Sequence, residues 1–166
     1  MRAVAISGSP RSPSKSKTLA QAMLTALEAR GCDTRLIDLA TLPAEALLAR
    51  AESLEVDEAI AAVGHADIFI AATPTYRALY TGLLKCFFDL MPQSHLAGKP
   101  CIGLQTGIAP QHALAAEYGF RPLFASLGGV PVVVLYATDA EFEDGVPNYG
   151  LLTRLQQVAD AVIHSP

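Results

Sequence analysis

Residues 7–18 bring together the residue types that bind phosphate groups. The stretch reads Ser-Gly-Ser-Pro-Arg-Ser-Pro-Ser-Lys-Ser-Lys-Thr and lies between a short apolar run and a segment with helical spacing. Backbone N–H groups at a helix N-terminus, together with the helix dipole, attract anions. Hydroxyl groups add donors, and an arginine such as Arg11 binds two phosphate oxygens at once. The sequence therefore predicts a phosphate-binding loop; the alternative is a solvated serine-rich loop that ends in an N-cap.

Two further loops carry residues suited to a flat ring system. One of them, residues 73–82, holds a proline and two tyrosines, Tyr76 and Tyr80. The other, residues 106–110, holds Gly107, which allows a backbone to approach a ligand closely. The three loops together suit a ring system with a phosphate tail. The alternatives are that the tyrosines cap the sheet edge or fill a subunit contact, and that Gly107 only marks a turn.

The sequence offers no common catalytic or metal-binding pattern. Cys32, Cys86 and Cys101 lie far apart, so they form no CxxC pair, zinc spacing or disulfide framework. The four histidines have no i,i+4 partner, and neither a GxGxxG turn nor a GxxxxGK(S/T) loop occurs. We therefore expect reduced, partly buried cysteines, no metal and no catalytic nucleophile.

Short apolar runs alternate with segments of helical spacing along the chain. We predict strands over residues 3–6, 34–37, 68–72, 101–105 and 132–136, and helices over residues 16–30, 56–63, 83–91, 113–127 and 151–163. Continuous apolar strands that alternate with helices indicate a parallel sheet covered on both faces. Residues 40–53 contain a proline and are left open as a connection or a short extra helix.

Five such strands in an α/β chain of 166 residues fit a flavodoxin-like three-layer sandwich with sheet order 2-1-3-4-5. In this order the chain reverses direction beside the first strand, and ligands bind there outside the carboxyl ends of the strands. The three candidate loops follow the first, third and fourth strands, which agrees with this rule. We expect residues 1–166 to form one domain.

Composition limits the partners of the chain. A net charge of -4 and a pI near 5.5 argue against nucleic acid or an anionic membrane as partner. No run of eighteen apolar residues and no leader pattern occurs, so we predict a cytoplasmic protein. Because the mean hydropathy is +0.33, we expect apolar surface to be buried in a homodimer or homotetramer. The helix at residues 83–91, apolar on nearly every side, is the candidate contact.

With these loops identified, the chain resembles the NAD(P)H-dependent FMN reductases of the flavodoxin-like superfamily, above all the alkanesulfonate/methanesulfonate type. The likeness covers residues 1 to about 135, and it is carried by Gly8-Ser9-Pro10-Arg11 with Ser14 and Ser16, by Thr73-Pro74-Thr75-Tyr76 and Tyr80-Thr81-Gly82-Leu83-Leu84-Lys85, and by Thr106-Gly107 with His112 and Tyr118. Ile108 departs from the pattern, since many relatives have a second glycine there.

The resemblance implies NAD(P)H-dependent reduction of FMN, with NADPH or NADH as hydride donor and a flavin-dependent monooxygenase, as in sulfonate sulfur assimilation, receiving the reduced FMN. The implied FMN-binding residues are Ser9, Arg11, Ser14, Ser16, Lys17 and Thr18 at the phosphate, Pro74, Thr75, Tyr76 and Arg77 at the ring edge and ribityl chain, and Thr106 and Gly107 at the pyrimidine end. Hydride transfer to a flavin requires stacking and exclusion of competing reactions. We therefore nominate no catalytic acid, base or nucleophile.

The helix at residues 113–127 contains Pro122, which has no N–H group and crowds the carbonyl of Tyr118. We expect this helix to kink or to form a π-bulge there. The resemblance implies that Tyr118 lies at a subunit interface near the flavin and keeps FMN exchangeable. The alternative is a tyrosine packed at a proline kink. We interpret His112 as a hydrogen-bonded histidine at a helix start in preference to a proton donor.

Two other functions stay open at this point. One is a flavoprotein that retains FMN and reduces a quinone, an azo compound or a metal ion. The other is a flavodoxin-type electron carrier without enzymatic turnover. Flavodoxins are usually more acidic and have a threonine-rich phosphate loop, whereas this chain has Gly8-Ser9-Pro10-Arg11. The sequence therefore favours the reductase.

Overall fold

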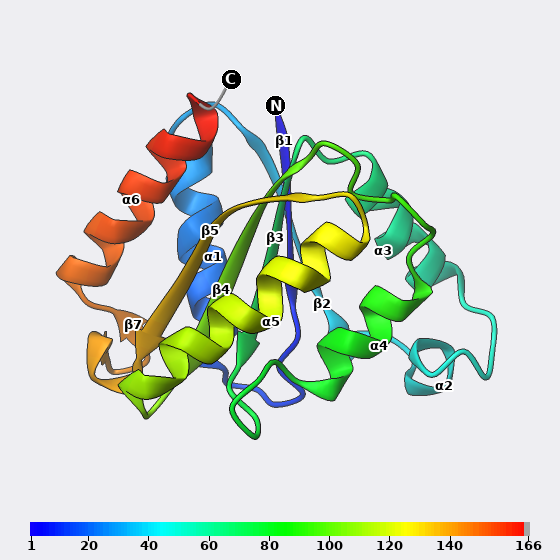
Figure 1. Cartoon of the computed structure of the whole chain (residues 1–166), viewed down its shortest axis with the longest axis horizontal. Coiled ribbons are helices and arrows are strands. Elements are labelled where there is room, and N and C mark those ends of the chain that lie inside the picture. Colours follow the sequence, from blue (N-terminus) through cyan, green and yellow to red (C-terminus); the bar gives the residue numbers. More distant parts are fainter. Residues whose placement is uncertain (165–166) are drawn as a thin grey trace.

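Five parallel strands form the centre of this computed structural model, which describes residues 1–164 (Figure 1). Their spatial order is β2 (Asp33–Asp38), β1 (Arg2–Ser7), β3 (Ile68–Pro74), β4 (Pro100–Gly107) and β5 (Val130–Thr138). The flavodoxin-like order 2-1-3-4-5 is thereby confirmed. Every predicted strand lies within the observed one.

Helices cover both faces of the sheet, which gives three layers (Figure 1). One face carries α1 (Lys15–Glu28) and α6 (Tyr149–Ile163), and the other carries α3 (Leu54–Gly64), α4 (Gly82–Leu90) and α5 (Ala113–Ser126). Successive strand side chains point to opposite faces. In β1, Ala3 and Ala5 belong to the apolar cluster beneath α1 and α6, while Val4 and Ile6 belong to the other cluster. Burial on both faces explains why the strands are apolar throughout.

The register brings the carboxyl ends of the strands to one edge of the molecule. Ser7 pairs with Ala72, and Gly107 pairs with Thr138. The loops that follow β1, β3, β4 and β5 therefore lie side by side. None of the helices within residues 1–164 is long and apolar enough to cross a membrane.

Two segments differ from, or add to, the predicted elements. The open stretch at residues 40–53 contains the end of a 3-10 turn, Leu39–Thr41, and the short helix α2 (Ala44–Leu47). After β5, a 3-10 turn (Asp139–Glu141) leads into a hairpin of β6 (Phe142–Glu143) and β7 (Val146–Pro147), which the sequence analysis missed.

One prediction about a helix is wrong, and another is wrong in one of its two alternatives. The helix α4 is amphipathic rather than apolar on nearly every side, because Lys85 and Asp89 form an i,i+4 ion pair on its outward face. Its buried residues are Leu84, Phe87 and Phe88. The helix α5 is α-helical from Ala113 to Ser126 with Pro122 inside it, so the π-bulge, one of the two distortions expected there, does not form; the kink stays a prediction.

Thr81, the N-cap of α4, joins the loops that follow β1 and β3. Its hydroxyl accepts a hydrogen bond from the Leu84 amide at 3.1 Å and donates one to the Gly8 carbonyl at 2.5 Å. The Thr81 amide donates to Oγ1 of Thr73 at 3.1 Å. The side chain is buried, so water cannot replace these partners. Thr81 therefore fixes the distance between the two loops.

We predict that Thr81→Val lowers the free energy of unfolding by about 2 kcal/mol, because it removes an N-cap and leaves a buried carbonyl without a donor. Urea unfolding measures this change. The control is Thr153→Val, whose hydroxyl donates only to the Tyr149 carbonyl on the surface of α6. A surface change of this kind costs within about 0.5 kcal/mol. Equal effects of the two substitutions would contradict the role assigned to Thr81.

Candidate functional site

A cavity of about 770 Å³ lies outside the carboxyl ends of the strands. Ligand pockets in proteins typically measure about 300–1,000 Å³. The location is where open α/β sheets bind ligands. The cavity is lined by four loops, with side chains or backbone of Ser9, Arg11, Pro13, Ser14, Lys15, Pro74, Thr75, Tyr76, Arg77, Ala78, Thr106, Gly107, Ile108, Ala109, His112 and Asp139.

In the loop after β1, serine hydroxyls shape the backbone. The Ser9 hydroxyl donates to the Arg11 carbonyl at 3.0 Å and accepts from the Arg11 amide at 3.3 Å. Ser14 is the N-cap of α1, and its hydroxyl accepts from the Lys17 amide at 3.3 Å. It also shares a hydrogen bond with the Ser16 hydroxyl at 3.0 Å. These hydroxyls hold the loop in one conformation beside the helix N-terminus.

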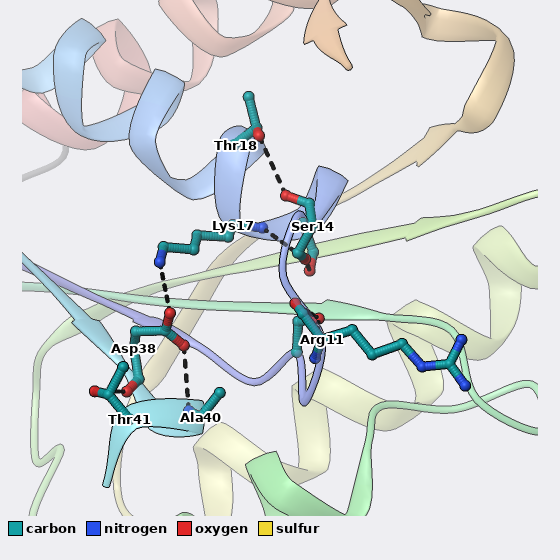
Figure 2. A network of polar contacts seen from close by, with 9 residues as sticks. Arg11, Ser14, Lys17, Thr18, Asp38, Ala40 and Thr41 are labelled. Carbon is teal, nitrogen blue, oxygen red and sulfur yellow. Dashed lines mark hydrogen bonds and ion pairs between the residues drawn. The ribbon is translucent and has the colours of Figure 1, made fainter. Parts of the chain in front are cut away.

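Donors suited to an anion remain at this end of α1. The first amides of a helix have no intrahelical acceptor. Among the described hydrogen bonds, the amides of Lys15 and Ser16 have no backbone acceptor. The Arg11 side chain is exposed and extends away from the other labelled residues in Figure 2. Within residues 1–164 its guanidinium forms no ion pair. An unpaired arginine beside a helix N-terminus is suited to a phosphate.

Three of the predicted phosphate-binding residues do not line the cavity. Lys17 places its ammonium 2.5 Å from Oδ2 of Asp38, at the end of β2 (Figure 2). The Thr18 hydroxyl donates to the Ser14 carbonyl at 3.2 Å. Ser16 is fully buried. The structure thus directs these side chains away from the cavity, Ser16 into the protein and the half-exposed Lys17 and Thr18 towards partners at Asp38 and Ser14.

The loop after β3 contains a tight turn with unusual backbone angles. The amides and carbonyls of Tyr76 and Leu79 bond each other reciprocally at 2.8 and 3.1 Å. Between them, Arg77 and Ala78 have φ values of 51° and 67°. Left-handed residues other than glycine cost of order 1–3 kcal/mol each, and such residues cluster at functional sites. The turn presents Tyr76 and Arg77 to the cavity.

Hydrogen bonds join this turn to the loop after β4. The amide and the hydroxyl of Thr75 both donate to the Thr106 carbonyl, at 2.7 and 2.9 Å. The buried Gln105 side chain donates from Nε2 to Oγ1 of Thr75 at 2.9 Å. The ends of β3 and β4 therefore form one rigid wall.

Gly107 is required by packing within the protein. A Cβ atom there would lie 2.4 Å from the Tyr136 hydroxyl and 2.8 Å from Oγ1 of Thr75. The Tyr136 hydroxyl donates to the Ala109 carbonyl at 3.0 Å and so holds the loop after β4 in place. Ile108 is 82% exposed at the cavity rim. The absent side chain thus leaves room for Tyr136, and the expected close approach of a ligand to this backbone stays a prediction.

The sequence analysis missed two charged cavity residues as site candidates. Lys15 and Asp139 form an ion pair, with Nζ 3.1 Å from Oδ2. His112, which we interpreted as a hydrogen-bonded histidine at a helix start, lies at the start of α5 but its side chain forms no cap hydrogen bond there, and it lines the cavity. Asp139 directly follows β5, and this position after a parallel strand is the signal that could have found it. Tyr118, by contrast, is 74% exposed on α5 and does not line the cavity.

No cysteine of the described chain lines the cavity. Burial raises the pKa of the Cys101 thiol, on β4, to about 12, so this thiol stays protonated at neutral pH. Within residues 1–164 no group of three or more metal-ligating side chains is found. In the described part of the chain, Arg11 and Arg77 of the cavity lining form no ion pair, and hydrogen bonds join the loops after β3 and β4, which suits a planar, phosphate-bearing molecule.

Comparison with known proteins assigns the chain to a family. Residues 1–143 match the family described as NADPH-dependent FMN reductase. The NADH-dependent FMN reductase SfnF of Pseudomonas fluorescens is 36% identical over 149 residues, which cover 87% of this chain and 80% of that protein. The FMN reductase (NADPH) of Escherichia coli is 34% identical over 148 residues, with 87% and 76% covered.

A solved structure agrees with these relatives. The apo form of NADH:FMN oxidoreductase (EMOB) matches with a TM-score of 0.87 and 37% identity, and the match covers 97% of this chain and 87% of that one. Residues 1–143, which the family model matches, include all four loops that line the cavity. The chain belongs to the NADPH-dependent FMN reductase family.

Proposed function

We propose that this protein transfers a hydride from NADPH or NADH to FMN in the cavity at the carboxyl ends of the strands. Family membership supports the reaction, and the unpaired Arg11 at the N-terminus of α1 is the observation that ties it to this cavity. A dianionic phosphate would gain charge-assisted hydrogen bonds there.

The lining residues fit the parts of FMN. Arg11 and the amides of Lys15 and Ser16 would hold the phosphate, and the hydroxyls of Ser9 and Ser14 lie beside them. We propose that Ser16, Lys17 and Thr18 support this loop from behind. The ring edge and ribityl chain would contact Pro74, Thr75, Tyr76 and Arg77.

The backbone of Thr106 and Gly107 would face the pyrimidine end of the ring. Donors at that end favour the reduced form, because they stabilise its negative charge. When bound, FMN supplies the hydride-accepting ring, and the protein residues bind it, orient it and exclude competing reactions. No side-chain nucleophile enters this scheme.

We further propose that reduced FMN leaves the cavity for a partner monooxygenase, and that the protein acts in the cytoplasm as a homodimer or homotetramer. Arg11 at the proposed phosphate end and Arg77 at the proposed ring edge are both exposed, so both parts of bound FMN would be open to solvent. For assembly, Leu114 and Tyr118 are 65% and 74% exposed on α5 and form an apolar surface suited to a subunit contact.

Arg11→Ala tests the phosphate assignment. We expect FMN to bind about tenfold more weakly, because a hydrogen bond to a charged group contributes about 1.5–3 kcal/mol. Riboflavin, which has no phosphate, should bind as before. Steady-state NAD(P)H oxidation with and without added FMN measures the activity, and equilibrium dialysis measures both affinities. Arg50→Ala removes the same charge from an exposed residue outside the cavity and serves as control. Equal losses for FMN and riboflavin would overturn the assignment.

Tyr118→Ala tests whether Tyr118 keeps FMN exchangeable. We expect the variant to purify with FMN bound and to transfer reduced flavin poorly. The reason is that the Tyr118 ring, placed at a subunit contact, would no longer limit how tightly the protein retains FMN. The absorbance of the purified protein and the rate of free-FMN reduction report these effects. A colourless variant with the parent rate would leave Tyr118 a purely structural role.

Light scattering tests the proposed assembly. We expect a dimer or a tetramer at micromolar concentration, because the exposed apolar residues of α5 favour association. The measured mass should exceed the 17.5 kDa of the monomer. Leu114→Glu, which places a charge in the proposed contact, should shift the population towards this monomer. A parent protein that is monomeric at this concentration would refute the assembly.

A further inference from the structure

Lys15 and Asp139 place an ion pair in the wall of the cavity, at the end where the phosphate is proposed to bind. Nζ of Lys15 lies 3.1 Å from Oδ2 of Asp139, and the two side chains are 38% and 43% exposed. Lys15 is the first residue of α1, and its ammonium also lies 5.7 Å from the centre of the Phe142 ring. The lysine thus has two partners before any ligand binds.

Asp139 is the one acidic group in a cavity wall that otherwise carries cations. Of the cavity-lining residues in the described part of the chain, Asp139 alone has a carboxylate, whereas Arg11, Lys15 and Arg77 are cationic. The carboxylate therefore lowers the positive potential that an incoming phosphate meets.

The turn that carries Asp139 is held rigidly. The Glu141 side chain accepts hydrogen bonds from the amide and hydroxyl of Thr138, at 2.7 and 3.0 Å. Glu141 also pairs with Arg154 of α6, which donates to the Tyr136 carbonyl at 3.0 Å. These contacts fix the backbone that carries Asp139, and the Lys15 ion pair holds its carboxylate at the cavity wall.

A carboxylate at a helix N-terminus interacts with the same dipole and cations as a phosphate does. We infer that Asp139 competes with the FMN phosphate for Lys15 and for the positive end of α1, and thereby weakens FMN binding. This inference rests on the proposed function. Its consequence is kinetic as well, since most differences in affinity between related complexes lie in the dissociation rate. Asp139 thus promotes release of FMN.

The test compares FMN and riboflavin binding by equilibrium dialysis in the parent protein and in Asp139→Asn. We expect FMN to bind about threefold to tenfold more tightly to the variant, which is the scale of half-exposed charge pairs acting on a doubly charged phosphate. Riboflavin should bind equally to both proteins. The gain for FMN should shrink at high salt, because salt screens exposed charges.

Two control variants separate this effect from net charge and from shape. Asp89→Asn breaks the ion pair with Lys85 on α4, outside the cavity, with the same change in net charge, and should leave FMN affinity unchanged. Asp139→Glu keeps the charge and should keep the parent affinity. If Asp139→Asn does not fold, the same comparison of FMN and riboflavin binding is made with Asp139→Ser.

The outcomes are distinguishable. Unchanged or weaker FMN binding by Asp139→Asn would overturn the inference, as would an equal gain for riboflavin. If Arg11→Ala weakens FMN while Asp139→Asn does not tighten it, only this inference fails. If the parent protein binds FMN no better than riboflavin, the phosphate site of the proposed function fails and the inference fails with it.

Discussion

The hydroxyl of Thr81 holds together two loops whose separation determines whether the cavity exists. It donates to the Gly8 carbonyl at 2.5 Å, while the Thr81 amide donates to Thr73 at 3.1 Å. The N-terminus of α4 lies so close to the first loop that a Cβ on Gly8 would be 2.7 Å from Cβ of Leu84. Because glycine is needed for this approach and threonine for the hydrogen bonds, these positions couple the loop after β1, where we propose that phosphate binds, to the cavity wall formed by the loop after β3.

The charges around the N-terminus of α1 are arranged by the ends of different strands. Lys17 pairs with Asp38 at the end of β2, and Lys15 pairs with Asp139 after β5. Both lysines of the first turn are therefore partly neutralised, while Arg11 keeps a free guanidinium within residues 1–164. The serine hydroxyls are bonded within the loop, so the backbone amides and Arg11 supply most of the attraction for an anion.

The fold could be predicted from the sequence because buried parallel strands are apolar throughout, and their loops must meet at one edge. The hairpin after β5 was predictable too, because an Asp-Gly pair such as Asp144-Gly145 is a strong hairpin signal. In the structure these two residues have φ values of 51° and 81°. The direction in which each side chain points could not be predicted from the sequence. Residues two apart on a helix do not face each other, so Lys15 reaches the cavity while Lys17 does not. Which of them does so depends on tertiary structure that the local sequence does not encode.

The rigidity of the walls bears on how such a site could release its ligand. The strained turn at Arg77 and Ala78 is closed by two reciprocal backbone hydrogen bonds. It follows Thr75, which is bonded twice to Thr106. A preformed site avoids the entropic cost of ordering loops, and this alone favours tight binding. Weak retention in a rigid cavity therefore requires an unfavourable interaction with the bound molecule. In this cavity, the Asp139 carboxylate beside the proposed phosphate end would provide that interaction without loosening the walls.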